Sequence, residues 1–140
     1  MKKIAVFPGS FDPITIGHVD IINRGLPLFD KLIIGIGVNS QKKYLFPIER
    51  RVGWIKKIYE FEPKIEVETY NGLTVNFCEL RQATYILRGI RSSGDFEFER
   101  AVSQTNRVLS RNIETIFILA NPSLAAVSSS IVRDVIVNGG

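Results

Sequence analysis

Short runs of β-branched and other apolar residues alternate along the chain with stretches in which apolar residues recur every three or four positions. Runs of the first kind are typical of strands buried on both faces of a sheet, whereas the second spacing predicts amphipathic helices. The predicted strands cover residues 4–7, 32–38, 65–70, 85–87 and 113–119. The predicted helices cover residues 17–29, 49–60, 73–82 and 96–111, and a fifth begins near residue 129.

This alternation predicts an α/β fold. Strands that alternate with helices indicate a parallel sheet with right-handed crossovers, and five units are too few to close an eight-stranded barrel. We therefore predict an open, doubly wound, five-stranded parallel sheet of the Rossmann-like kind. Ligands bind such sheets beyond the carboxyl ends of the strands, where the strand order reverses. The loops expected at this edge are residues 8–16, 39–46, 71–72, 89–94 and 120–128.

Pro27 interrupts the first predicted helix, whose apolar face is marked by Val19, Ile22 and Phe29. Proline lacks a backbone donor, and its ring crowds the carbonyl group four residues earlier. We therefore expect the helix to kink or to end early near this residue.

Length and composition favour one globular domain, residues 1–140, because a chain of this size with 45% hydrophobic and 23% charged residues suits a single core. The net charge is +4, and residues 1–60 carry ten basic against five acidic side chains. A surplus this small argues against nucleic acid as a partner and suits a small phosphorylated ligand.

Single cysteine and histidine residues exclude several chemistries. With Cys78 alone there is no internal disulfide, CxxC pair or thiolate zinc site, and with His18 alone there is no two-histidine metal site. Only residues 4–7 are apolar before Pro8 and Gly9, which is too short for a secretory signal, and no apolar run approaches the ~20 residues of a membrane span. We expect a cytoplasmic protein with no membrane association.

The residues after the first strand, Gly-Ser-Phe-Asp-Pro-Ile-Thr-Ile-Gly-His at 9–18, form the first candidate site. No GxxxxGK[ST] motif occurs, and Gly35-Ile36-Gly37 lacks the third glycine of a dinucleotide fingerprint. A helix start offers free N–H groups to an anion, and an imidazole there adds a donor. The alternative is that Thr15 merely caps the helix and His18 is a satisfied helix-end histidine, which this motif alone favours.

Three further motifs also lie in predicted strand-to-helix loops. Lys42 and Lys43 follow the second strand. Arg88-Gly89-Ile90-Arg91 follows the fourth, where we expect Gly89 to allow a tight turn between two guanidinium groups that grip phosphate oxygens. Ser128-Ser129-Ser130 opens the last helix. Each has an ordinary structural explanation alone, but all four motifs fall on the edge where an open sheet builds its site.

These motifs supply cations and hydrogen-bond donors rather than a nucleophile with its base. Such a site suits attack by a phosphate on a nucleotide α-phosphate, because the nucleophile is already an anion and catalysis consists of positioning and charge neutralisation. Asp95 and Glu97 are interpreted as partners of the helix dipole, whereas Glu99 is a candidate ligand contact.

Taken together, the motifs resemble the bacterial phosphopantetheine adenylyltransferase family of the nucleotidylyltransferase superfamily. The resemblance rests on residues 9–13 with Thr15, Gly17 and His18, then Lys42-Lys43, 88–91 with 95–99, and 128–130, in order from Lys3 to Asp134. It implies transfer of the adenylyl group of ATP to 4'-phosphopantetheine, giving dephospho-coenzyme A and pyrophosphate, with Mg²⁺ on the ATP phosphates. It also implies a homohexamer, with coenzyme A as a feedback ligand.

The resemblance also assigns roles by position. It implies that His18 acts at the transition state, and that phosphopantetheine meets Ser10, Lys42, Leu73, Thr74 and Arg88. It implies that ATP meets Ser10, Phe11, His18, Gly89, Ile90, Arg91, Glu99, Leu124, Ala125, Ala126, Val127, Ser128, Ser129 and Ser130.

Some positions differ from the family pattern. Leu124 replaces an aromatic residue, Thr74 a larger apolar one and Asp134 a glutamate, so we expect altered adenine packing and a reshaped pantetheine end. Pro27 is unusual for the first helix, and the chain ends at Gly140 where the family continues into another short segment.

Two other functions stay open. One is a sister cytidylyl- or adenylyltransferase with another phosphorylated acceptor, against which Lys42, Arg88 and 128–130 argue. The other is a non-catalytic nucleotide- or RNA-binding module on the same fold. The RNA version predicts steep salt dependence, but the chain has no aromatic RNA-stacking motif.

Overall fold

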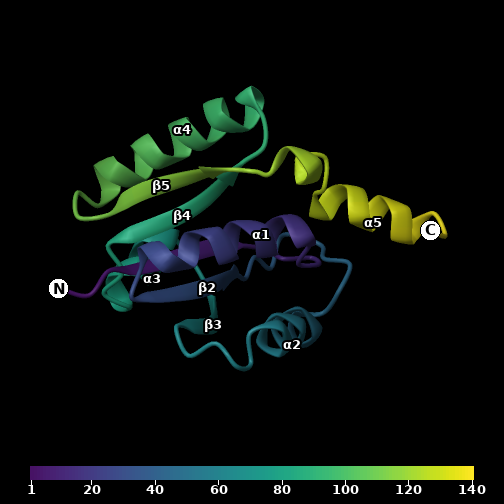
Figure 1. Ribbon diagram of the computed structural model, residues 1–140, viewed down its shortest axis with the longest axis horizontal. Helices are drawn as coiled ribbons and strands as arrows, with labels where there is room; N and C mark the ends of the chain where they lie inside the picture. The colour runs from purple at the N-terminus through teal and green to yellow at the C-terminus, as the bar shows by residue number, and fades with distance from the viewer.

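The computed structural model describes residues 1–140 and contains one five-stranded sheet in which every neighbouring pair is parallel. The strand order is β3-β2-β1-β4-β5, which confirms the predicted doubly wound α/β fold (Figure 1). The strands are β1 (Ile4–Gly9), β2 (Lys31–Gly37), β3 (Ile65–Tyr70), β4 (Tyr85–Ile90) and β5 (Glu114–Leu119).

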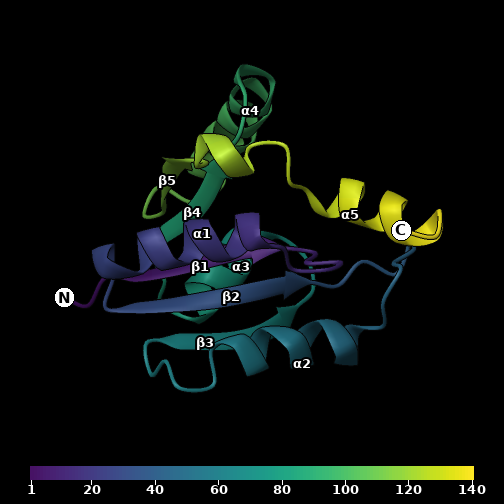
Figure 2. The ribbon, with the colours of Figure 1, turned by 45° about the vertical axis from the view of Figure 1, so that its right-hand side comes forward.

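Five α-helices and two short 3₁₀ helices connect or follow the strands (Figure 2). They are α1 (Ile16–Gly25), η1 (Leu26–Leu28), α2 (Ile48–Ile58), α3 (Thr74–Leu80), α4 (Ser93–Leu109), η2 (Pro122–Leu124) and α5 (Ser129–Val137). No helix is both long and apolar enough to cross a lipid bilayer.

The two faces of the sheet bury separate apolar clusters, because successive side chains of a strand point to opposite faces. Ala5 and Phe7 of β1 belong to a cluster with Ile21 and Ile22 of α1. Val6, between them, belongs to a second cluster that contains Val75, Phe77 and Cys78 of α3. The sheet is therefore covered on both faces, and Cys78 lies inside a helix as predicted.

The first helix ends early, as the position of Pro27 predicts. α1 stops at Gly25, and residues 26–28 continue as the 3₁₀ helix η1 with the proline near its start. Gly25, the last residue of α1, allows close packing against the sheet, since a Cβ there would lie 2.6 Å from Cδ2 of Leu87 on β4. The predicted extension of this helix to Phe29 was wrong.

The fourth strand is longer than predicted, and the turn expected at Gly89 was wrong. Arg88, Gly89 and Ile90 all lie within β4, where they pair with residues 117–119 of β5. Gly89 serves packing instead, because a Cβ at this position would lie 2.9 Å from Cγ1 of Ile21 on α1. Only Arg91 follows the strand as a loop residue.

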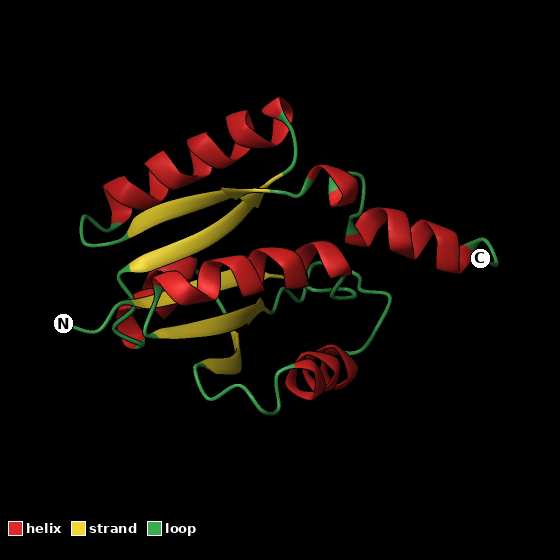
Figure 3. Cartoon of the chain, in the orientation of Figure 1, coloured by secondary structure: helices red, strands yellow, loops and turns green.

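The carboxyl ends of the strands point to one side of the molecule, toward the start of α5 (Figure 3). The order reverses between β1 and β4, because β1 connects to β2 on one side and pairs with β4 on the other. Parallel sheets bind ligands at this crevice. The loop after β1 and the end of β4 are therefore the places to look for a site.

Candidate active site

The loop after β1 holds His18 in place through the cap of α1. Thr15 is the N-cap residue, and its backbone N–H donates to Nδ1 of His18 at 3.0 Å. The backbone N–H of His18 donates in return to Oγ1 of Thr15 at 3.4 Å. This reciprocal arrangement satisfies backbone donors that the helix leaves free. The capping role expected for Thr15 is confirmed, and the same cap orients the imidazole.

The protonation state of His18 follows from that contact. Because Nδ1 accepts from a backbone N–H, it carries no proton, and the ring proton lies on Nε2. Burial, and then the positive charges of Arg88 and Arg91, lower the pKa of His18 from 6.5 to about 4. At neutral pH the side chain is therefore an uncharged donor at the edge of the sheet.

Phe11 packs against His18 and depends on a glycine to do so. Its buried ring lies edge-on to the imidazole, with 5.0 Å between the ring centroids. The backbone at Phe11 has φ +49°, in the left-handed region, and folds the ring back over β1. A Cβ at Gly9 would lie 3.0 Å from that ring, so the glycine leaves room for it.

Arg88 is held by three hydrogen bonds. Its Nε and Nη2 atoms donate to the two carboxylate oxygens of Glu99 on α4 at 3.0 and 2.5 Å, and Nη1 donates to the carbonyl oxygen of Pro8 at 2.8 Å. Glu99 is the one buried residue of α4. A paired, fork-shaped contact of this kind fixes the plane of the guanidinium group as well as its position.

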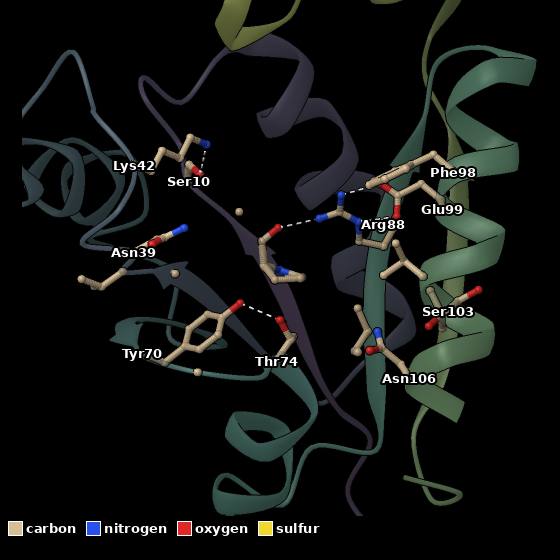
Figure 4. Close-up of a pocket in the computed structure, with 18 of the residues that line it drawn as sticks. Ser10, Asn39, Lys42, Tyr70, Thr74, Arg88, Phe98, Glu99, Ser103 and Asn106 are labelled. Carbon is tan, nitrogen blue, oxygen red and sulfur yellow. Dashed lines mark hydrogen bonds and ion pairs between the residues drawn. The ribbon is translucent and has the colours of Figure 1, made fainter. Parts of the chain in front are cut away.

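Two cavities meet at this edge, with volumes of about 410 and 350 Å³. The first, here the α4 cavity, runs between β3 and α4 (Figure 4). The second, the His18 cavity, lies between the first loop and the start of α5. Figure 4 shows Ser10 and Lys42 on one side of the α4 cavity and Arg88 and Glu99 on the other. The residues common to both cavities are Pro8, Gly9, Ser10, Lys42, Arg88 and Glu99.

Lys42 differs from the other cations at the site because it has no carboxylate partner. Arg88 pairs with Glu99, and Arg91 pairs with Asp95 at 3.2 Å. The ammonium group of Lys42 instead donates to Oγ of Ser10 at 3.1 Å and forms no salt bridge. Its charge is therefore available to an anionic ligand, whereas the arginine charges are partly balanced within the protein.

The start of α5 completes the His18 cavity. Ser128 caps the helix by accepting from the backbone N–H of Ile131 at 3.2 Å, and Ser129 donates to the carbonyl oxygen of Pro13 at 2.7 Å. The second bond ties α5 to the loop after β1, 116 residues away in sequence. The cavity is lined by all three predicted serines and by Leu124 and Val127.

Most of the predicted site residues come together at this edge, and four do not line either cavity. Thr74 lines the α4 cavity, where its hydroxyl lies 2.8 Å from that of Tyr70. Gly89 and Arg91 line the His18 cavity. The four that line neither are Leu73, which is exposed at the start of α3, Ile90, which is buried in β4, and Ala125 and Ala126.

Sequence reasoning missed the residues that hold the loop after β2. Asp12 is buried, and its carboxylate accepts from the backbone N–H groups of Leu45 and Phe46 at 2.8 and 2.9 Å. Arg51 of α2 is 3% exposed and donates to the carbonyl oxygen of Ser10. The sequence did hold one sign of this role: Arg51 lies one helical turn before Ile55, so a charged residue falls on the apolar face of α2.

The side chains of the site do not form a cage for a resident metal ion. No three His, Cys, Asp or Glu side chains gather anywhere in the structure. The carboxylates nearest the cavities already accept hydrogen bonds: Asp12 from backbone amides, Asp95 from Arg91 and Glu99 from Arg88. A divalent cation at this site would enter with the phosphates of a ligand.

Fold and site together define a nucleotidyltransferase. The model of the cytidylyltransferase-like protein family matches residues 6–135 of this chain. A solved bifunctional NMN adenylyltransferase/ADP ribose pyrophosphatase from Francisella tularensis has the same fold, with a TM-score of 0.73 and 19% identity. That match covers 100% of this chain and 43% of the other.

Within this class, the sequence relatives identify the family. Phosphopantetheine adenylyltransferases of Flavobacterium johnsoniae and Flavobacterium psychrophilum are 55% and 57% identical to this chain over 140 residues. Each match covers 100% of this chain and 91% of the relative. The chain belongs to the phosphopantetheine adenylyltransferase family, which confirms the resemblance found in the motifs.

Proposed function

We propose that this protein transfers the adenylyl group of ATP to 4'-phosphopantetheine, giving dephospho-coenzyme A and pyrophosphate in coenzyme A synthesis. In this reaction a phosphate oxygen of the acceptor forms a bond to the α-phosphorus of ATP. The bond from that phosphorus to the bridging oxygen of the β-phosphate breaks, and pyrophosphate leaves with the electron pair. No proton has to be removed from the nucleophile, so the reaction suits a site without a strong base.

One observation carries the proposal beyond family membership: two cavities share a wall that contains Ser10, Lys42 and Arg88. A reaction that joins two phosphorylated substrates needs two pockets that meet at cationic and donor groups. His18 lines only one of the two cavities. We therefore assign ATP to the His18 cavity and the pantetheine chain to the α4 cavity.

In this assignment His18 donates from Nε2 to an oxygen of the α-phosphate. Charge builds on that group in the transition state, and a fixed, uncharged donor stabilises it without reorganisation. Arg91, Glu99, Leu124 and the serines at 128–130 bound the nucleotide side. Ser10, Lys42, Thr74 and Arg88 bound the acceptor side.

The wider assignments from the family stay part of the proposal. Nucleotidyl transfer from ATP generally uses a divalent cation, and we propose Mg²⁺ bound to the ATP phosphates, where it offsets their negative charge. We also propose a cytoplasmic homohexamer with coenzyme A as a feedback ligand.

The reaction is tested by pyrophosphate release from ATP and Mg²⁺ with 4'-phosphopantetheine, nicotinamide mononucleotide or glycerol phosphate, with the product mass measured in parallel. We expect release with phosphopantetheine alone, together with the mass of dephospho-coenzyme A. Pyrophosphate release with another acceptor instead would refute the proposed substrate. No release with any of the three acceptors, in folded protein, would refute the proposed reaction.

The roles are tested by two variants. His18→Ala is expected to lower kcat by about 10²–10³-fold while the protein stays folded, since it removes one donor to developing charge. Lys42→Ala is expected to raise the KM for phosphopantetheine more than the KM for ATP. Unchanged turnover in the first variant, or equal losses for both substrates in the second, would refute the assigned roles.

A further inference from the structure

We propose that Arg51 is a positioning residue for the acceptor subsite, and that it acts through the ring of Tyr44 to hold the ammonium group of Lys42 at the shared wall of the two cavities. The proposal rests on the assignment of Lys42 to the acceptor phosphate made above. Neither Arg51 nor Tyr44 belongs to the set of residues that the motifs indicate.

Arg51 joins two loops from beneath. Its side chain is buried on the inner face of α2, and Nη1 donates to the carbonyl oxygen of Ser10 at 2.8 Å in the loop after β1. Its Nε donates to the carbonyl oxygen of Phe46 at 3.0 Å in the loop after β2. One guanidinium group therefore fixes the spacing of the two loops that carry Ser10 and Lys42.

The ring of Tyr44 connects Arg51 to Lys42. The guanidinium carbon of Arg51 lies 4.0 Å from the centroid of the ring, and Nζ of Lys42 lies 5.5 Å from it. Both distances are within the range of cation–π contacts. The same ammonium group donates to Oγ of Ser10, whose backbone carbonyl Arg51 also holds. Lys42 is thus held at two points that both depend on Arg51.

Asp12 restricts the same loop from its other end. Its carboxylate accepts from the consecutive backbone N–H groups of Leu45 and Phe46, directly after Tyr44. On the near side, the backbone N–H of Lys42 donates to the carbonyl oxygen of Asn39 at 3.1 Å. The segment from Lys42 to Tyr44 therefore spans two anchored points, and the exposed lysine stands on a fixed backbone.

A purely structural role would not require arginine at this position. Ile55, one turn later, is fully buried on the same helix, so an aliphatic residue suits this face. Burying a guanidinium group has a desolvation penalty, which an aliphatic side chain at the same position would avoid. What only arginine supplies is two donors to different loops together with a flat cationic face for the ring of Tyr44.

The first test measures steady-state KM for phosphopantetheine and for ATP in Tyr44→Leu and Tyr44→Phe. Loss of the ring is expected to raise the acceptor KM by about five- to tenfold and to change the ATP KM by less than about twofold. Phenylalanine keeps the ring and is expected to restore most of the lost affinity. Wild-type constants in folded Tyr44→Leu, or equal increases for both substrates, would overturn the proposal.

The second test addresses Arg51 itself, with its exposed neighbour as the matched control. Arg51→Met is expected to raise the acceptor KM at least as much as Tyr44→Leu, whereas Arg50→Met is expected to leave both KM values unchanged. Combined with Lys42→Ala, Arg51→Met is expected to add little, because its effect passes through the lysine. Additive losses in the double variant would refute the positioning role.

Calorimetric binding of 4'-phosphopantetheine separates this proposal from the function on which it rests. If wild-type protein binds the acceptor but does not turn it over, the reaction fails while the positioning role is still tested by the Kd values of the Tyr44 variants. If wild-type protein does not bind it at all, both proposals fail. If Arg51→Met does not fold, the two Tyr44 variants test the proposal by themselves, because Tyr44 is partly exposed and its substitution disturbs the core less.

Discussion

At the scale of single residues, the chemistry of the site depends on how each charge is balanced. His18 is neutral because its ring is buried beside arginines, and Arg88 is fixed because Nε and Nη2 donate to Glu99 and Nη1 donates to the carbonyl oxygen of Pro8. Lys42 has no such partner. The site therefore combines a fixed neutral donor, arginines paired with carboxylates and one lysine whose charge is free to bind a phosphate.

The titration of His18 can be followed directly, because it is the only histidine of the chain. We predict a pKa of about 4 in the folded protein, measured by NMR of the imidazole nitrogens across pH 3–8. The same residue in urea serves as the control and is expected near 6.5. A folded-state pKa at or above 6.5 would show that the ring is not buried beside Arg88 and Arg91.

The same shift predicts how folding stability depends on pH. Because the unfolded chain binds a proton near pH 6.5 and the folded chain only near pH 4, the contribution of neutral His18 is fully present above pH 6.5. It is lost as pH falls from 6.5 toward 4. Urea midpoints at pH 7 and pH 5 are expected to differ less in His18→Gln than in the wild type. An equal difference in both proteins would contradict the prediction.

Glu99 is predicted to matter through Arg88. Glu99→Gln removes the charge that balances the guanidinium group, and we expect unfolding free energy to fall by about 1–2 kcal/mol, since the pair is partly buried. Turnover is expected to fall as well, because Arg88 loses its fixed plane. Glu97→Gln is the matched control: its pair with Arg100 is largely exposed, and we expect a change below about 0.5 kcal/mol. Equal effects in the two variants would contradict this account.

At the scale of elements, the site depends on how closely helices approach the sheet. α1 carries His18 and lies against β4, where Gly89 leaves no side chain in the way of Ile21. Arg88 precedes that glycine and points to the opposite face, toward α4. The register of β4 therefore sets the positions of two functional groups at once.

Gly89→Ala tests this packing. The added Cβ would lie 2.9 Å from Ile21 in a closely packed contact, and we expect a loss of about 1–3 kcal/mol in unfolding free energy, measured by urea denaturation. Gly53→Ala in α2 is the control, because nothing lies within 4 Å of its added Cβ. Alanine is a better helix former than glycine there, and we expect a gain of up to about 1 kcal/mol. A stable Gly89→Ala protein would show that α1 sits farther from β4.

At the scale of the whole molecule, a single copy of the chain leaves many large apolar side chains exposed to solvent. About half of them lie on α4 and α5 and at the end of β5, and these include Phe98, Val108, Leu119 and Val137. α5 buries none of its residues and extends away from the sheet (Figure 1). Large exposed apolar areas are typical of surfaces that contact another chain, which supports the proposed oligomer.

We therefore predict that the purified protein has a mass several times the 15.8 kDa of one chain, with six chains as the expected number. Light scattering coupled to size exclusion measures this directly. Its melting temperature is expected to rise with protein concentration, because association stabilises the folded chain by mass action. A monomer at all concentrations would refute the proposed homohexamer.

The sequence by itself determined the elements and the kind of site. Hydrophobic periodicity is local, so the five strands and the helices could be predicted from it, and the backbone chemistry of Pro27 predicted the early stop of the first helix. The motif from Gly9 to His18 and the serines at 128–130 could be placed at strand or helix ends for the same reason. Their order along the chain also matched one family.

Only the tertiary structure decided which groups meet and in what state. The pairing of β4 with β5 turned the expected loop at Gly89 into strand, since ladder hydrogen bonds are not local. The neutral state of His18 depends on its burial and on two arginines at least 70 residues away in sequence. The contacts of Arg51 with Ser10 and Tyr44 arise because α2 folds back under two loops. Periodicity shows which face of a helix is buried, but not which distant residue lies against it.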